Sequence, residues 1–294
     1  MQVIVANSYG MCFGVRDAMQ ALARIDQPRS TAIFGELVHN EVVLHQLDVR
    51  GFQQISEIDR VETPTAPQVV ITAHGISQRR RRQLTDAGKT LIDTTCPLVT
   101  RVHRAAQDLA KSGAFVIVIG RPDHVEVEGI TGDLDAFAVV HSLAEVETYS
   151  ASRIGIVCQT TVPSSEAAII RQRIQECNPQ AEIRWIDTIC QPTKDRQQAL
   201  ADLLGQVDAV VVVGGRHSHN TRRLTEQCRQ QNLPAVQVQE ADELDADWFA
   251  AFATVGLTAG TSTLPETFAA VHQRLLAIAQ RTNTCAAVDP LLAH

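Results

Sequence analysis

Short apolar runs alternate along the chain with longer amphipathic segments. The runs at residues 3–6, 68–72 and 209–213 are rich in Val and Ile, a further apolar run ends in glycine at residues 31–35, and polar residues or glycines follow most of the runs. Such runs predict strands covered on both faces, as in parallel sheets. In several of the segments between them, apolar residues recur at the spacing of an amphipathic helix. Strands alternating with helices indicate an α/β protein with parallel sheets and right-handed crossovers.

The same unit occurs three times. A strand-like run precedes each of three cysteines, and a helix-like segment follows each of them: Cys12, Cys96 and Cys190. A second polar residue follows at almost constant spacing: His39 is 27 residues after Cys12, His124 is 28 after Cys96, and Ser218 is 28 after Cys190. A third polar position comes after a later strand in each unit: His74, Thr160 and Ser262. A repeat of about 90 residues is too long for a solenoid and predicts three small α/β lobes.

The repeat also predicts the domain boundaries. The three α/β lobes are expected at residues 14–95, 96–187 and 188–281, with residues 1–13 and 282–294 as terminal segments that pack on the lobes. The tail from Thr282 shows no clear periodicity.

All nine repeated residues fall in loops between a strand and a helix. In open α/β sheets these loops bind ligands, because they lie beyond the carboxyl ends of the strands. His, Ser, Thr and Asn side chains at helix starts, with Asn220 among them, are suited to a phosphate or diphosphate. Glu126 is an unusual residue for an anion site, and it is either a proton donor or an ordinary helix-start acid. Glu128 is the better candidate for the second role.

Composition narrows the choice of function. The net charge of −7 and the 4% of aromatic residues argue against nucleic-acid binding. The N-terminus resembles no signal peptide, and no apolar run approaches the ~20 residues of a membrane helix, so a cytoplasmic protein with no membrane partner is expected. Seven cysteines are an odd count, which favours metal, cluster or catalytic thiols over disulfides.

Three thiols leave two kinds of metal site open. A fourth protein ligand would complete a structural zinc site, whereas an iron–sulfur cluster held by three cysteines leaves one iron for substrate. The other cysteines are interpreted as buried, inert thiols: Cys158, Cys177, Cys228 and Cys285. Histidines outside the repeat are interpreted as surface or satisfied core residues: His45, His103, His141, His272 and His294.

A run of four arginines, residues 79–82, lies on a predicted helix. We interpret it as a solvated helix surface. The alternative is a docking patch for an acidic electron carrier, because clustered charge steers encounters between proteins.

At this point the motifs resemble a known family. The chain is similar over essentially its whole length to the 4-hydroxy-3-methylbut-2-enyl diphosphate reductases, the LytB or IspH family. The resemblance rests on nine segments that occur in the family's order: residues 10–15, 38–40, 73–75, 93–99, 124–129, 159–161, 189–190, 218–220 and 258–262.

The resemblance implies a trefoil of three pseudo-threefold-related α/β lobes around a central [4Fe–4S] cluster. Cys12, Cys96 and Cys190 would ligate three irons, and the allylic hydroxyl of the substrate would bind the fourth. Two electrons from a ferredoxin or flavodoxin and two protons would remove that hydroxyl as water, which yields isopentenyl and dimethylallyl diphosphate in the last step of the methylerythritol phosphate isoprenoid pathway.

The family pattern also implies roles for the polar residues. Glu126 would be the proton source, Thr160 and His124 would relay the proton or position the substrate, and Thr193 would lie near the cluster. The remaining polar residues would hold the diphosphate: His39, His74, Ser218, Asn220 and Ser262. His219 replaces a small residue of the family and would add an imidazole donor beside them.

Two alternatives stay open. The chain could reduce a different allylic or phosphorylated substrate, which a direct assay with the diphosphate would reveal. It could also be a non-catalytic cluster or zinc protein that senses redox state, which predicts metal binding without any reduction of the diphosphate.

Overall fold

The computed structural model describes residues 1–38, 40–216 and 218–288. Three parallel four-stranded sheets account for all twelve strands in this part of the chain, so the prediction of an α/β fold with three lobes is confirmed. None of the described helices is both long enough and apolar enough to span a membrane.

The first sheet has the strand order β3-β2-β4-β5. Its strands are β2 (Thr31–Phe34), β3 (Gln53–Ile55), β4 (Gln68–Ile71) and β5 (Thr90–Asp93). The α-helices of this part of the chain are α1 (Phe13–Ala23), α2 (Glu41–Val49) and α3 (Gln78–Asp86), and two 3-10 helices accompany them, η1 (Pro28–Ser30) and η2 (Ile58–Val61).

The second sheet repeats this order as β7-β6-β8-β9. Its strands are β6 (Phe115–Ile119), β7 (Phe137–Val140), β8 (Arg153–Cys158) and β9 (Glu182–Trp185). Its helices are α4 (Pro97–Lys111), α5 (Val125–Thr131), η3 (Leu143–Glu145) and α6 (Ser164–Cys177).

The third sheet has the order β1-β12-β10-β11. Its strands are β1 (Gln2–Val5), β10 (Ala209–Val213), β11 (Ala235–Val238) and β12 (Thr254–Ala259). Its helices are α7 (Gln191–Leu204), α8 (His219–Gln230), η4 (Ala241–Glu243), η5 (Asp247–Ala251) and α9 (Pro265–Val288). Every residue of β10 is buried, as expected for a central parallel strand covered on both faces.

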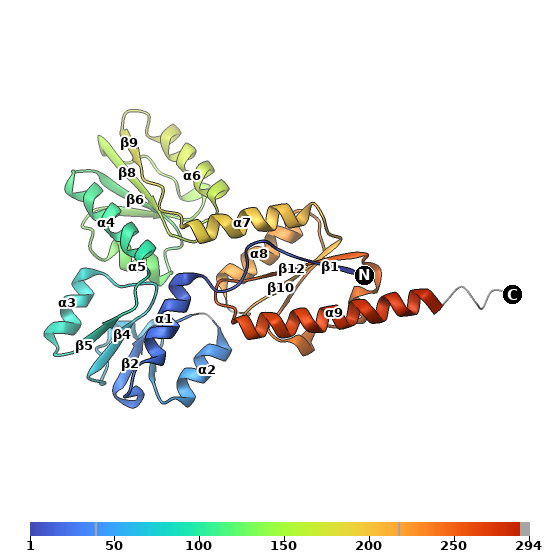
Figure 1. Ribbon diagram of the computed structural model, residues 1–294. Helices are drawn as coiled ribbons and strands as arrows, with labels where there is room; N and C mark the ends of the chain where they lie inside the picture. Colours follow the sequence, from blue (N-terminus) through green and yellow to red (C-terminus); the bar gives the residue numbers. More distant parts are fainter. Residues whose placement is uncertain (39, 217, 289–294) are drawn as a thin grey trace. The chain divides into compact units, whose positions relative to one another are not determined.

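The N-terminal strand completes the third sheet. β1 pairs in parallel with β12, in the position that β5 and β9 occupy beside β4 and β8. All three sheets therefore share one strand order, although the third is assembled from both ends of the chain (Figure 1).

The C-terminal helix extends into the segment without clear periodicity. α9 continues past Thr282 to Val288. No Gly or Pro interrupts residues 266–288, and a helix once nucleated propagates at little cost through residues of only moderate propensity.

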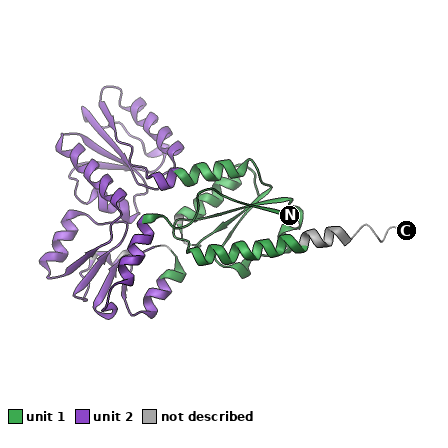
Figure 2. Ribbon diagram, in the orientation of Figure 1, with its two compact units in different colours: residues 1–13, 39–43, 195–294 green, residues 14–38, 44–194 purple. Residues whose placement is uncertain are grey.

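The chain forms two compact units, shown in Figure 2. Unit 1 comprises residues 1–13, 39–43 and 195–294 and contains the third sheet. Unit 2 comprises residues 14–38 and 44–194 and contains the first and second sheets.

Candidate active site

Each repeated thiol follows the edge strand of a sheet and directly precedes a helix. Cys96 follows β5 and is the N-cap of α4, with Pro97 in the first helical turn. Cys190 follows β9 and precedes α7, and Cys12 follows β1 and precedes α1. The common strand order of the three sheets explains why these cysteines have matching sequence contexts.

The backbone around Cys96 leaves no room for a larger neighbour. Its main-chain N–H donates to the carbonyl of Ala73, at 3.0 Å, which ties this loop to the end of β4. A Cβ atom on Gly14 would lie 2.7 Å from the Cys96 sulfur, closer than any real contact. Glycine at position 14 is therefore required for the observed position of the thiol.

Cys190 is held by the loop that carries Thr160. Its N–H donates to the carbonyl of Thr160, at 3.0 Å, and its sulfur lies 3.0 Å from the hydroxyl of Thr193. Two residues earlier, the hydroxyl of Thr188 donates to the carbonyl of Cys158 and accepts from its N–H, both at 2.7 Å. Sequence analysis missed Thr188, because nothing local distinguishes this hydroxyl from an exposed one.

In unit 1 the loop before Cys12 has its own anchor. Gly10 has a φ of +68° and donates its N–H to the carbonyl of Ala259, at 3.1 Å. The buried guanidinium of Arg196 donates to the Gly10 carbonyl, at 2.5 Å. Sequence analysis missed Arg196 as well, because its partner lies 186 residues away.

Glu126 is a buried carboxyl in the first turn of α5. Only 1% of the residue is exposed. One carboxylate oxygen accepts from the N–H of Thr160 at 2.7 Å, and the other accepts from its hydroxyl at 2.9 Å. Burial raises the pKa of Glu126 to about 7, although the two hydrogen bonds from Thr160 act in the opposite direction. Near neutral pH the group can therefore hold a proton and release it. Glu128 is exposed, as expected of an ordinary helix-start acid.

His124 caps α5 through its ring. Its Nδ1 accepts from the N–H of Glu126, at 3.1 Å, so a neutral ring carries its proton on Nε2. The His74 ring packs edge-on against it, with the ring centroids 5.6 Å apart. Two loops of unit 2, after β4 and after β6, thus bring His74, His124 and Glu126 together with Thr160.

Unit 1 gathers the hydroxyl and amide candidates at one sheet edge. Ser218 is the N-cap of α8 and accepts from the N–H of Thr221, at 3.3 Å. The side-chain nitrogen of Asn220, the second residue of the same helix, is buried and has no hydrogen-bond partner among the described residues. The buried Ser262 follows β12, and its carbonyl accepts from the side chain of Asn40, at 2.8 Å. Asn40 also caps α2, a role that sequence analysis did not assign.

The side chains of two predicted substrate ligands, His39 and His219, are not described. His39 lies outside the described residues, as does His217, which directly precedes Ser218. His219 is the first residue of α8, and its side chain lies outside the described part.

Two thiols outside the repeat are buried as expected, whereas Cys177, expected to be buried, is only partly so. Cys158 and Cys228 are fully buried, and burial raises the pKa of both thiols, that of Cys228 to about 11.

His103 is a core residue, but its Nε2 has no hydrogen-bond partner in the described part of the chain, so it is not the satisfied histidine that was expected. Burial lowers the pKa of His103, and nearby Asp133 opposes this effect.

Three of the four arginines at residues 79–82 make ion pairs or hydrogen bonds with other parts of the fold. Arg79 and Arg81 pair with Asp135 and Asp93, and Arg80 donates to two main-chain carbonyls. Arg79 and Arg82 are exposed, as expected of a solvated helix surface, whereas Arg80 and Arg81 are partly buried by their contacts.

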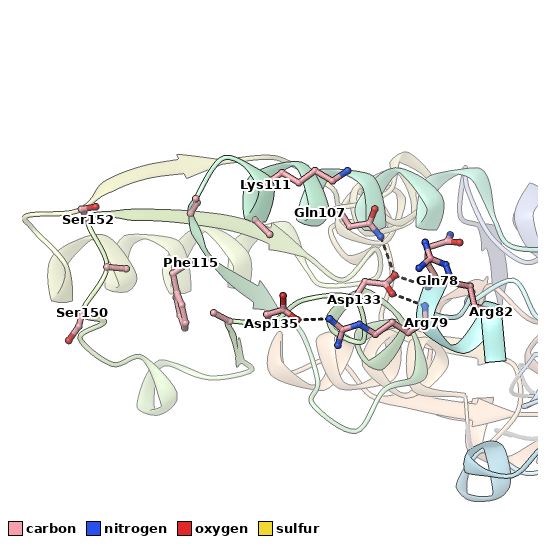
Figure 3. A pocket seen from close by; sticks show the side chains of 15 residues that line it. Gln78, Arg79, Arg82, Gln107, Lys111, Phe115, Asp133, Asp135, Ser150 and Ser152 are labelled. Carbon is pink, nitrogen blue, oxygen red and sulfur yellow. Dashed lines mark hydrogen bonds and ion pairs between the residues drawn. The ribbon is translucent and has the colours of Figure 1, made fainter.

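A groove of about 910 Å³ is lined by the basic side chains of Arg79, Arg82 and Lys111 (Figure 3). The carboxylates of Asp133 and Asp135 also line it. It reaches Phe115 at the amino end of β6, whereas His124 follows the carboxyl end of the same strand. The groove is thus separated from the site edge of the second sheet by the length of a strand, about 16 Å. Its mixed charge and position do not favour docking of an electron carrier at this end.

Within residues 1–38, 40–216 and 218–288, no three His, Cys, Asp or Glu side chains lie close enough together to bind a single metal ion.

Fold and site together define a class of three-lobed parallel α/β proteins with thiols and anion-type donors at the carboxyl edges of the sheets. The model of the LytB protein family matches residues 3–276, and the chain belongs to this family.

Similar proteins share one activity in their names. A relative from Solidesulfovibrio magneticus is 35% identical, with 94% of this chain and 99% of the relative covered, and one from Acinetobacter baylyi is 34% identical, with 94% and 90% covered. Both are called 4-hydroxy-3-methylbut-2-enyl diphosphate reductase.

Two solved structures of diphosphate reductases are similar to this chain in fold and sequence. The E-1-hydroxy-2-methyl-but-2-enyl-4-diphosphate reductase from Plasmodium falciparum has a TM-score of 0.83 at 28% identity, with 94% of this chain and 87% of that chain covered. An (E)-4-hydroxy-3-methyl-but-2-enyl diphosphate reductase, called the terminal enzyme of the non-mevalonate pathway, has a TM-score of 0.68 at 31% identity, with 94% and 100% covered.

Proposed function

We propose that this protein is an oxidoreductase that converts (E)-4-hydroxy-3-methylbut-2-enyl diphosphate to isopentenyl and dimethylallyl diphosphate, the last step of the methylerythritol phosphate pathway in the cytoplasm. Two electrons and two protons enter, the allylic C–O bond breaks, and the hydroxyl leaves as water. The observation that carries the proposal is the buried Glu126, which is held by Thr160 and has a pKa of about 7.

The three repeated thiols fit a [4Fe–4S] cluster. Cys12, Cys96 and Cys190 each directly precede a helix, where the macrodipole favours anionic ligands. We propose that they hold the cluster, with Thr193 beside Cys190. When bound, the cluster would supply electrons from a ferredoxin or flavodoxin to the substrate.

The proton chemistry is assigned to residues of unit 2. Glu126 would deliver the proton to the leaving hydroxyl, because its carboxyl is protonated in a substantial fraction of molecules near pH 7. Thr160 would orient that carboxyl through its two hydrogen bonds. His124 would present its Nε2 proton to the substrate, because its Nδ1 is engaged by the backbone.

The family resemblance assigns the diphosphate to hydroxyl, amide and imidazole donors. In unit 1 these are Ser218, His219, Asn220 and Ser262, and the buried amide nitrogen of Asn220 is a donor available to a phosphate oxygen. His39 and His74 would add imidazole donors. Helix N-termini favour the negative charge of such a ligand.

The test is an anaerobic assay of the purified protein with the diphosphate and a reduced viologen as electron source. The wild type should consume the diphosphate, and Glu126→Gln should lose at least about 100-fold in kcat, as expected when a positioned proton donor is removed. Glu128→Gln, which changes an exposed carboxyl on the same helix, is the matched control.

Metal analysis completes the test. About four irons and four sulfides per chain, lost in the Ser variants of Cys12, Cys96 and Cys190 but kept in Cys177→Ser, support the cluster. Stoichiometric zinc without sulfide, or a full cluster without reduction of the diphosphate, would overturn the proposed reaction.

A further inference from the structure

A short segment between β3 and β4 contributes nothing to the predicted site, yet it contains an almost buried ion pair. Arg60 Nη1 lies 3.1 Å from the Oε2 atom of Glu57, and the side chains of these two residues are only 10% and 23% exposed. A shielded pair of this kind differs from a surface ion pair, because removal of one partner leaves the other charge poorly solvated. The other hydrogen bonds of Glu57 and Arg60 show which parts of the chain this ion pair holds in place.

Each partner of the pair reaches a different loop of the first sheet. The Oε1 atom of Glu57 accepts from the main-chain N–H of Glu36, at 2.8 Å. The Nη2 atom of Arg60 donates to the carbonyl of Gly75, at 3.3 Å. Glu36 lies in the segment after β2 that continues into His39, and Gly75 directly follows His74.

The backbone of both loops is shaped to receive this pair. Gly35 has a φ of +96°, and a Cβ atom there would lie 2.8 Å from the Glu57 carboxylate. Gly75 has a φ of +72°. Both positions favour glycine, so the close approach of the ion pair depends on two loops that only glycine forms without strain.

The guanidinium of Arg60 is also fixed by packing. It lies over the ring of Phe34, the last residue of β2, with its carbon 5.2 Å from the ring centroid. The side chain of Arg80 donates to the main-chain carbonyl of Arg60, at 2.7 Å, and so fixes the backbone of the segment. A planar guanidinium stacked on one face directs two separate terminal nitrogens to two acceptors in a fixed geometry, whereas a lysine ammonium donates from a single nitrogen.

We propose that Glu57 and Arg60 are positioning residues that fix the loop leading into His39 and the loop carrying His74 as one unit, and thereby set the affinity for the diphosphate end of the substrate. This inference rests on the proposed function. Neither residue is assigned a contact with the substrate or the cluster.

This arrangement predicts a separation of binding from chemistry. Loss of the pair lets the segment at Glu36 and the loop carrying His74 shift independently, which weakens the binding of an anion that needs donors from both. Glu126 and Thr160 lie on loops of the second sheet, with their own hydrogen bonds. The loss should therefore be found in KM, with kcat little changed.

The variants for the test are Arg60→Met, Arg60→Lys, Glu57→Gln and the double variant. Arg50→Met is the matched control, because Arg50 also stacks on a phenylalanine of the same lobe, Phe52, at 5.2 Å, but donates to carbonyls near the end of α1. Each iron-loaded protein is assayed anaerobically for kcat and KM, and the Kd of inorganic diphosphate is measured by calorimetry.

Arg60→Met and Glu57→Gln should each raise KM and the Kd of inorganic diphosphate by about tenfold or more, with kcat within about twofold of wild type. The double variant should be no worse than the worse single variant, because the pair acts as one unit. Arg60→Lys should recover only part of the loss, and Arg50→Met should match the wild type.

Equal Kd values for Arg60→Met, Glu57→Gln and Arg50→Met would overturn the inference, as would a fall in kcat at unchanged KM. Should Arg60→Met fail to fold, the nearly isosteric Glu57→Gln decides the question alone. A wild type that neither reduces the allylic diphosphate nor binds inorganic diphosphate refutes the proposed function instead, so the two failures are distinguishable.

Discussion

The ionisation of Glu126 should be visible in the stability of the protein. In the unfolded chain this carboxyl has its ordinary pKa of 4.5, whereas burial raises the pKa to about 7 in the folded state. Below about pH 4.5 both states hold the proton. As pH rises from 4.5 to about 7, the unfolded state loses its proton first, so the free energy of unfolding falls. Above about pH 7 both states have lost the proton, and the free energy of unfolding falls no further from this cause.

The size of this effect follows from the two pKa values. At about 1.4 kcal/mol for each pH unit, a rise from 4.5 to about 7 corresponds to about 3 kcal/mol. Glu126→Gln has no charge to bury at any pH, so the variant should gain about 3 kcal/mol relative to wild type between pH 4.5 and pH 8. The same ionisation leaves about half of the carboxyls protonated at pH 7, against about 0.3% at an ordinary pKa, which is what a proton donor requires.

The assay is anaerobic urea unfolding of both proteins at several pH values, followed by the fluorescence of the two tryptophans, Trp185 in the same lobe and Trp248. The difference in the free energy of unfolding between Glu126→Gln and wild type should grow as pH rises from about 4.5 to about 7 and become constant above about pH 8. Glu128→Gln should show no such trend, because that carboxyl is exposed. A difference for Glu126→Gln that does not change with pH would refute the assignment of a buried carboxyl with a raised pKa.

Three further changes test the geometry of the site. Thr160→Val removes a hydrogen bond that favours the charged carboxylate, so the pKa of that group should rise further and the pH profile of kcat should move upward by about one unit, whereas Thr160→Ser should leave it in place. Thr188→Val leaves a buried N–H and a buried carbonyl unpaired and should lower the free energy of unfolding by about 2–4 kcal/mol in urea titrations, an effect that Thr188→Ser should avoid. Gly14→Ala places a methyl group against Cys96 and should lower the iron content per chain, while Gly205→Ala, with nothing within 4 Å of the new methyl, should keep it; equal iron in both would contradict the packing argument.

The sequence alone was sufficient for the repeat and for the class of the fold. Strand and helix patterns depend on neighbours within a few residues, so the three α/β lobes and the strand-to-helix position of Cys96 could be predicted. Glu126 could be chosen as a candidate because it is a carboxylate among hydroxyls and imidazoles, and because the family pattern implies a proton source at this position. Its pKa could not be predicted, because that depends on burial and on a hydrogen-bond partner 34 residues away.

The tertiary structure decided which distant residues support the site. Arg196 reaches the carbonyl of Gly10 across 186 positions, and Asn40 reaches that of Ser262 across 222, and no local pattern marks either contact. The role of β1 as the missing edge of the third sheet likewise appears only once the strands are paired. Local propensity determines which elements form, whereas strand pairing and packing bring their loops within hydrogen-bond distance, and the chemistry of this site depends on that distance.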